Sequence, residues 1–173
     1  MGRELNDRER LAVLDALALA SESLDPRIPL RIIGAVGTRL LIGVRGPEPL
    51  KHLKPDLARL TTLSAQIGAA GYFVFTLIPN SPDHLTEARM FCPALGIAED
   101  PVSGNAHGLL GAYLARLGLL GRSGERAHFS GVLGHSLHRP GRVEVELEFA
   151  GGELAGVWIS GQAVSIFQTE IEF

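Results

Sequence analysis

The chain has 173 residues, of which 46% are hydrophobic and 20% are charged, and its formal net charge at pH 7 is −3. This composition is typical of a soluble protein with one domain or two small lobes, long enough to bury its own core. The Lys and Arg residues form no basic stripe, which argues against nucleic acid as a partner. The single cysteine, Cys92, excludes an internal disulfide and favours a cytoplasmic location.

We expect no membrane partner. The longest stretch without charge, residues 60–82, contains Gln66, Asn80, two prolines and two glycines. It therefore predicts a helix end, a turn and a strand instead of a membrane span. No N-terminal segment has the pattern of a secretion signal.

The first 29 residues predict one helix and a connector. Asn6 and Glu9 have the spacing of a capping box, and an apolar helical repeat follows them. The repeat consists of Leu11, Leu14, Leu17 and Ala18. We expect a helix over residues 7–20 and a proline-containing connector over residues 21–29.

Residues 30–91 give strand and helix signals in turn. Residues 30–44 are rich in Ile, Leu and Val and predict two strands joined by a tight turn. A helix is expected to begin near Pro55, a favoured first helical position. Its apolar face consists of Leu57, Leu60, Leu63 and Ile67. Residues 72–78 and 86–91 predict two strands that lie side by side.

The second half predicts a buried helix and an antiparallel meander. Residues 105–120 are apolar or small on nearly every side, with Arg116 as the only full charge, which indicates a buried helix. Apolar and charged residues alternate over residues 142–149, as in a half-buried strand. Residues 154–160 and 163–167 predict further strands. The fold class is therefore α+β, with antiparallel strands curled as a barrel around one buried central helix.

The segment 89–107 carries the strongest functional signal, because it runs from a strand through a loop into the start of that helix. The loop contains Glu99, Asp100, Pro101, Ser103, Gly104 and Asn105. Unpaired amides and the helix dipole make such a helix start an anion site, and Gly104 lets a ligand approach the backbone. A carboxylate at position 100 beside this site favours a role in proton transfer.

Each candidate residue also has a structural interpretation. Asp100 could simply cap the helix, and Glu99 is expected to be a solvated neighbour. Arg89, on the strand that leads in, could balance Asp100 or a ligand carboxylate. His107, in the first helical turn, could contact the ligand, although ordinary packing or a hydrogen bond to a strand is the simpler expectation.

Metal and nucleotide sites are not expected. The group of His128, His135 and His138 lacks a third acidic or Cys ligand at regular spacing, so a loop with exposed histidines is the better interpretation. The Gly-containing segments lack the spacing of a P-loop or dinucleotide fingerprint. We therefore predict no cofactor.

The segment from Arg89 to Tyr113 resembles the PhzF-like isomerases, named for phenazine biosynthesis, which share the diaminopimelate epimerase fold. The matching pattern is Arg-Met-Phe, Pro, Gly-Ile, Glu-Asp-Pro, Gly and Ala-His. The resemblance implies a two-lobed enzyme with its active site between the lobes. Residues 30–173 correspond to the second lobe and residues 1–29 to the connection into it. The first lobe normally supplies a catalytic Glu, and nothing here matches that motif.

The resemblance assigns roles to single positions. Asp100 falls on the active-site aspartate, and Gly104 on the glycine whose amide faces the substrate. Asn105 replaces the usual Ser, so it can offer an amide group but no hydroxyl proton relay. Some racemases of this fold use two cysteines, whereas Cys92 is alone and is expected to be a buried core residue.

Two functional hypotheses follow. In the first, the chain is the C-terminal half of a cofactor-independent isomerase that transfers protons on a small carboxylate metabolite. Asp100 is then catalytic, and the substrate contacts come from Ser103, Gly104, Asn105, His107 and Arg89. The missing N-terminal lobe, or a homodimer, is the expected protein partner. In the second, the chain is a non-catalytic protein that binds small anions or dimerises.

Overall fold

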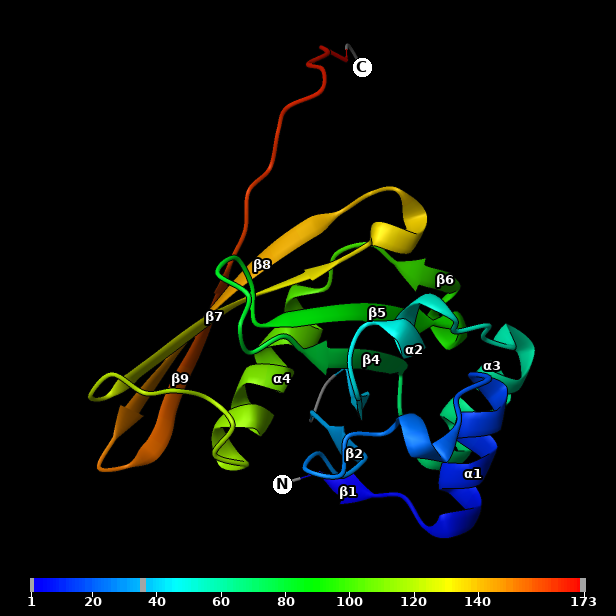
Figure 1. Ribbon diagram of the computed structural model, residues 1–173. Helices are drawn as coiled ribbons and strands as arrows, with labels where there is room; N and C mark the ends of the chain where they lie inside the picture. Colours follow the sequence, from blue (N-terminus) through cyan, green and yellow to red (C-terminus); the bar gives the residue numbers. More distant parts are fainter. Residues whose placement is uncertain (1, 35–36, 172–173) are drawn as a thin grey trace.

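The computed structural model describes residues 2–34 and 37–171, and it places nine strands of these residues in one sheet (Figure 1). The strands are β1 (Arg3–Glu4), β2 (Arg31–Ile33), β3 (Arg39–Val44), β4 (Gly71–Leu77), β5 (Thr86–Cys92), β6 (Ile97–Asp100), β7 (Arg126–Leu133), β8 (Gly141–Ala150) and β9 (Glu153–Ser160). Their order is β1-β2-β3-β4-β5-β7-β8-β9, and β6 pairs with β5 outside this path.

The sheet is mixed and open, which corrects the expected antiparallel barrel. The pairs β3–β4 and β5–β7 are parallel, because each connection crosses over through helices. Among the described residues, β1 and β9 end the sheet without pairing to one another. The fold is therefore α+β with one large sheet and few helices.

Four α-helices cover the two faces of this sheet in the described residues: α1 (Asp7–Ala16), α2 (Glu48–Lys51), α3 (Leu57–Ile67) and α4 (Gly104–Arg116). In Figure 1, α1 and α3 lie together at one side and α4 lies against the curl of β7, β8 and β9. None of these helices has the length and apolar character that crossing a bilayer requires.

Strand β4 separates two hydrophobic cores. Tyr72 belongs to the core that contains α1 and α3, whereas Phe73 belongs to the core that contains α4. Successive strand residues point to opposite faces, so an unbroken apolar run such as β4 fills both cores.

The helices α1 and α3 confirm their predicted types but not their bounds. Asn6 and Glu9 form the predicted capping box, with the Glu9 amide donating to Asn6 Oδ1 at 2.9 Å. Helix α1 ends at Ala16 instead of residue 20, since Ala18 adopts a left-handed backbone with φ of 53°. Helix α3 is capped by Asp56, so Pro55 precedes the cap and is not the first helical residue.

Helix α4 is the predicted buried helix, and it contacts β3, β8 and β9. Its buried residues are Ala106, His107, Leu110, Gly111, Tyr113, Leu114 and Ala115. A Cβ at Gly111 would lie 2.9 Å from Val145 Cγ1, which explains the glycine: β8 packs directly onto the helix backbone. The curl of the sheet around α4 is thus present without closure.

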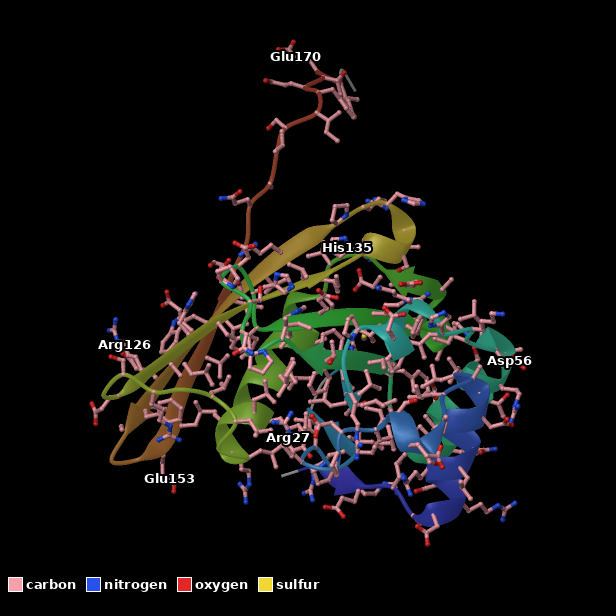
Figure 2. All side chains as sticks on the ribbon, in the orientation of Figure 1. Arg27, Asp56, Arg126, His135, Glu153 and Glu170 are labelled. Carbon is pink, nitrogen blue, oxygen red and sulfur yellow. The ribbon has the colours of Figure 1, made fainter. Side chains whose placement is uncertain are left out.

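Three segments differ from the prediction. Residues 97–100 form β6 and residues 126–133 form β7, although both were assigned to loops. Residues 163–167, predicted as a strand, lie instead in an exposed, extended segment without strand pairing. Figure 2 shows the side chains of this segment, up to Glu170, standing clear of the sheet. The alternation of apolar residues in this segment is typical of a strand, but in the described residues no other strand pairs with it.

Candidate functional site

Asp100 lies at the end of β6, on the same face of the sheet as α4. It pairs with Met90 of β5 in the antiparallel register, and directly opposed residues project to the same face. Met90 is fully buried in the core that contains α4. Asp100 itself is half-buried, and its Oδ1 accepts a hydrogen bond of 3.3 Å from the Val102 amide. Its carboxylate therefore lies next to the loop that leads into α4.

The N-terminus of α4 has no side-chain cap. Its N-cap residue is Ser103, whose hydroxyl makes no hydrogen bond to the first turn, whereas Asn6 and Asp56 do cap α1 and α3. Gly104 is half-buried and Asn105 is exposed, so this helix end reaches the surface. Uncapped first-turn amides at a positive helix end are suited to an anion.

Gly104 also accommodates β9. A Cβ at this position would lie 2.9 Å from Ile159 Cδ1, so the absence of a side chain lets β9 pass close to the start of the helix. The sequence suggested that Gly104 allows a ligand to approach the backbone. The structure shows that this glycine also allows close packing of β9.

His107 is fully buried beneath the helix end. A ring nitrogen, Nδ1, lies 2.9 Å from the Ser103 carbonyl oxygen and donates to it, and the ring meets Phe73 edge-on at a centroid distance of 5.1 Å. Burial lowers the pKa of His107, which keeps the imidazole neutral. His107 thus bonds to the backbone of the N-cap residue from the buried side of the helix. Its side chain does not reach the exposed helix tip, which is formed by Gly104 and Asn105.

This burial predicts a pH effect on stability. Because the folded-state pKa of His107 is depressed, its contribution is complete above the unfolded value of about 6.5 and is lost as pH falls towards the folded value. Below pH 6.5, the free energy of unfolding of the wild type should fall by up to about 1.4 kcal/mol per pH unit because of His107. We expect His107→Gln to remove this part of the pH dependence. Urea denaturation at several pH values measures it. The exposed His135→Gln, whose side chain makes no ion pair among the described residues, serves as the control for the loss of an imidazole.

Arg89 points away from Asp100. It forms a two-pronged ion pair with Glu99, with Nε–Oε1 of 2.9 Å and Nη2–Oε2 of 2.8 Å, and Nη1 also donates to the Leu50 and Leu53 carbonyls. Arg89 and Met90 are successive strand residues, so their side chains lie on opposite faces of β5. Glu99 is not the solvated neighbour that was expected, because Ser136 and Arg89 enclose it.

Arg39 is a charged residue near the site that no motif in the sequence indicated. It is the first residue of β3, is 9% exposed, and lies opposite Gly71 in the β3–β4 register. A Cβ at Gly71 would lie 2.6 Å from Cys92 Sγ, so Arg39, Gly71 and Cys92 follow one another across three strands. The sequence shows Arg39 only as a single charge before an apolar run. Which residues surround its side chain depends on the pairing register of β3 and β4.

Cys92 is a buried core residue, as predicted. Burial raises the pKa of its thiol; Arg39 lowers that pKa and Asp100 raises it.

The predicted loop of exposed histidines is only partly a loop. His128 lies on β7, with Nε2 3.0 Å from Glu144 Oε2 of β8, and His135 lies in a short 3-10 turn that ends before His138. In residues 2–34 and 37–171, no three His, Cys, Asp or Glu side chains gather as metal ligands.

Two surface hollows lie elsewhere. One of about 570 Å³ is bordered by Arg116, Arg122 and Phe149 near the C-terminal end of α4. Another of about 470 Å³ includes Lys51 and Arg89. Neither contains a residue between 100 and 107, so the helix tip with Asp100 is a surface feature of this chain rather than part of these hollows.

Comparison with known proteins agrees with this arrangement. Residues 2–169 match the family model described as phenazine biosynthesis-like protein, PhzC-PhzF. The chain belongs to this family. The PhzF resemblance of residues 89–113 is thereby confirmed and extends over nearly the whole sequence.

Two curated relatives and one solved structure each match more than nine-tenths of this chain. The uncharacterized isomerase YddE of Salmonella typhimurium is 37% identical over 161 residues, which are 93% of this chain and 54% of the relative. An uncharacterized isomerase of Clostridium acetobutylicum is 34% identical over 170 residues, 98% of this chain and 56% of the relative. The crystal structure of a Bacillus anthracis PhzF-family protein superposes with a TM-score of 0.72 at 20% identity.

The match is one-sided. The Bacillus anthracis structure covers 92% of this chain but only 57% of its own length is matched, and at 20% identity it shows the fold alone. The chain thus spans about half the length of the curated relatives that it matches.

Proposed function

We propose that this chain is the second-lobe half of a cofactor-independent PhzF-like isomerase acting on a small carboxylate metabolite. Its relatives are named isomerases, and they are nearly twice as long as the matched region. The other half, with the catalytic Glu, then comes from a separate polypeptide or from the remainder of a longer one. Residues 30–173 form the second lobe in this proposal.

The observation that carries the proposal is the position of Asp100 beside the uncapped start of α4. The amides of Gly104 and Asn105 hold the substrate carboxylate, and Asn105 is exposed at the tip. A base removes a proton from one carbon of the substrate, and an acid returns a proton at another carbon. Asp100 serves as one of these two groups. The elemental composition does not change, so the reaction needs no oxidant or reductant.

A deuterium-exchange experiment tests this proposal. The chain is mixed in D₂O with a polypeptide that contains the matching first lobe, and a panel of small carboxylates with acidic C–H bonds is followed by NMR. We expect exchange in the mixture and none with the chain alone. If both polypeptides are folded and associated but no carboxylate exchanges, the isomerase proposal fails.

A second candidate function is supported by exposed apolar side chains. Trp158 and Ile159 of β9 are 53% and 47% exposed, and the extended segment after β9 exposes Val164, Ile166 and Phe167. Exposed apolar surface of this kind suits association with another chain. A non-catalytic homodimer would use it for self-association, and size-exclusion chromatography with light scattering separates the two cases. A stable dimer without exchange activity favours this second candidate.

A further inference from the structure

Arg39 is a buried cation without a counter-ion. In the described part of the chain, no Asp or Glu oxygen lies within 4.0 Å of its guanidinium. Nη1 donates to the Gly37 and Thr38 carbonyls at 2.9 and 3.1 Å, and the buried Nε has no hydrogen-bond partner. Arg31, whose Nε is also unpartnered, differs because it pairs with Glu4. Burying an unpaired charge costs several kcal/mol. An anion bound from outside the chain would offset this cost at Arg39.

Arg39 lies at the same end of the molecule as the first turn of α4. A Cβ at Gly37 would lie 3.7 Å from Arg39 Nη1 and 3.9 Å from Asn105 Oδ1, so both side chains border the space beside this glycine. Towards the sheet, Arg39 lies opposite Gly71, and a Cβ at Gly71 would contact Cys92 Sγ and Met90 Cε, while Asp100 lies opposite Met90. The positive charge, the helix tip and the carboxylate thus form one neighbourhood.

We propose that Arg39 and the first-turn amides of α4 form one anion-binding subsite, which receives the carboxylate of a monoanionic metabolite. The inference rests on the proposed function for the nature of the ligand and adds a charge requirement to it. Arg39 contributes one positive charge, Asp100 one negative charge, and the helix end about half a positive charge. This balance favours a singly charged carboxylate over a phosphate dianion, which the Asp100 carboxylate repels.

An NMR titration of the full chain, labelled with ¹⁵N, tests the subsite. Sodium propionate and inorganic phosphate are the two probes, and the amide signals of Gly104 and Asn105 report binding. We expect propionate to shift both signals with saturation and phosphate to bind more weakly. Arg39→Gln should weaken propionate binding by about tenfold or more, because it removes a charge-assisted contact. The propionate affinity of Arg39→Lys should lie between those of the wild type and Arg39→Gln.

The matched control is Arg116→Gln, which removes one charge at the far end of the same helix. Its affinity should equal that of the wild type. Unchanged binding in Arg39→Gln, or an equal loss in Arg116→Gln, overturns the subsite but leaves the isomerase proposal to its exchange assay. Wild-type signals that do not respond to propionate overturn the subsite and the anion-holding role of the amides together. If Arg39→Gln does not fold, Arg39→Lys decides, and wild-type affinity in that variant counts against the subsite.

Discussion

Arg89→Met should lower the free energy of unfolding by about 3–5 kcal/mol, because it leaves the Glu99 carboxylate buried without its partner. The two side chains are only 15% and 10% exposed. The substitution also removes hydrogen bonds to the Leu50 and Leu53 carbonyls, which hold α2 and the residues that follow it against β5. Methionine keeps much of the volume of the side chain, so the effect reports the charge and its hydrogen bonds. Urea denaturation at pH 7 gives the value.

The pH dependence of this loss separates charge from packing. Burial tends to raise the pKa of Glu99, but hydrogen bonds from Arg89 and Ser136 outweigh it and keep the pKa below its usual value. The pair therefore stabilises the fold above the unfolded pKa of about 4.3, and this contribution is lost as pH falls through the lower folded value. The difference between wild type and variant should narrow below pH 4. Arg126→Met, in an exposed pair with Glu148, should cost less than about 1 kcal/mol at any pH.

The local elements of this fold were predictable because their signals are short-range. The capping box of α1, the alternation in β8 and the small, apolar surface of α4 are each contained within a few residues. The two parallel pairings and the open edge of the sheet depend instead on strands that lie far apart in the sequence. Local patterns do not encode which strands meet, so the expectation of antiparallel strands curled as a barrel was wrong in these respects.

The site shows the same division at the level of single residues. The motif around Asp100 and Gly104 is contiguous, and the sequence located it. The side on which Arg89 projects depends on the β5–β6 register, and the neighbourhood of Arg39 depends on two further registers. A shift of one residue reverses the face of every side chain in a strand. The sequence therefore could not tell which arginine lies near the helix tip.

Because of these registers, the two faces of β5 carry residues with different roles. The Arg89–Glu99 pair lies on one face, where it joins β5 to β6 and where Arg89 also bonds to Leu50 of α2 and to Leu53, while Met90 and Asp100 lie on the other. Glu99 and Asp100 are adjacent in β6, so the ion pair that holds Glu99 also sets the position of the Asp100 backbone. A change in Arg89 should thus affect the site indirectly, by loosening the strand that carries Asp100.

Asp100→Asn should reduce proton exchange in the two-lobe mixture by about 10²- to 10⁴-fold, which is the usual contribution of a general acid or base. Asparagine has nearly the same shape and can still accept the hydrogen bond from the Val102 amide, so the loop into α4 should keep its conformation. Its side chain cannot take up or release a proton near neutral pH. The measurement is the rate of deuterium incorporation under saturating carboxylate.

The exposed Asp83→Asn, which removes the same charge from the loop before β5, is the matched control and should retain full activity. The Arg39 subsite gives a second, independent readout, since Asp100→Asn removes the negative neighbour of the proposed anion. Propionate should bind this variant at least as tightly as the wild type while exchange is lost. A variant that binds propionate and still exchanges at the wild-type rate would show that Asp100 only shapes the loop, and the proton donor would then have to come from outside this chain.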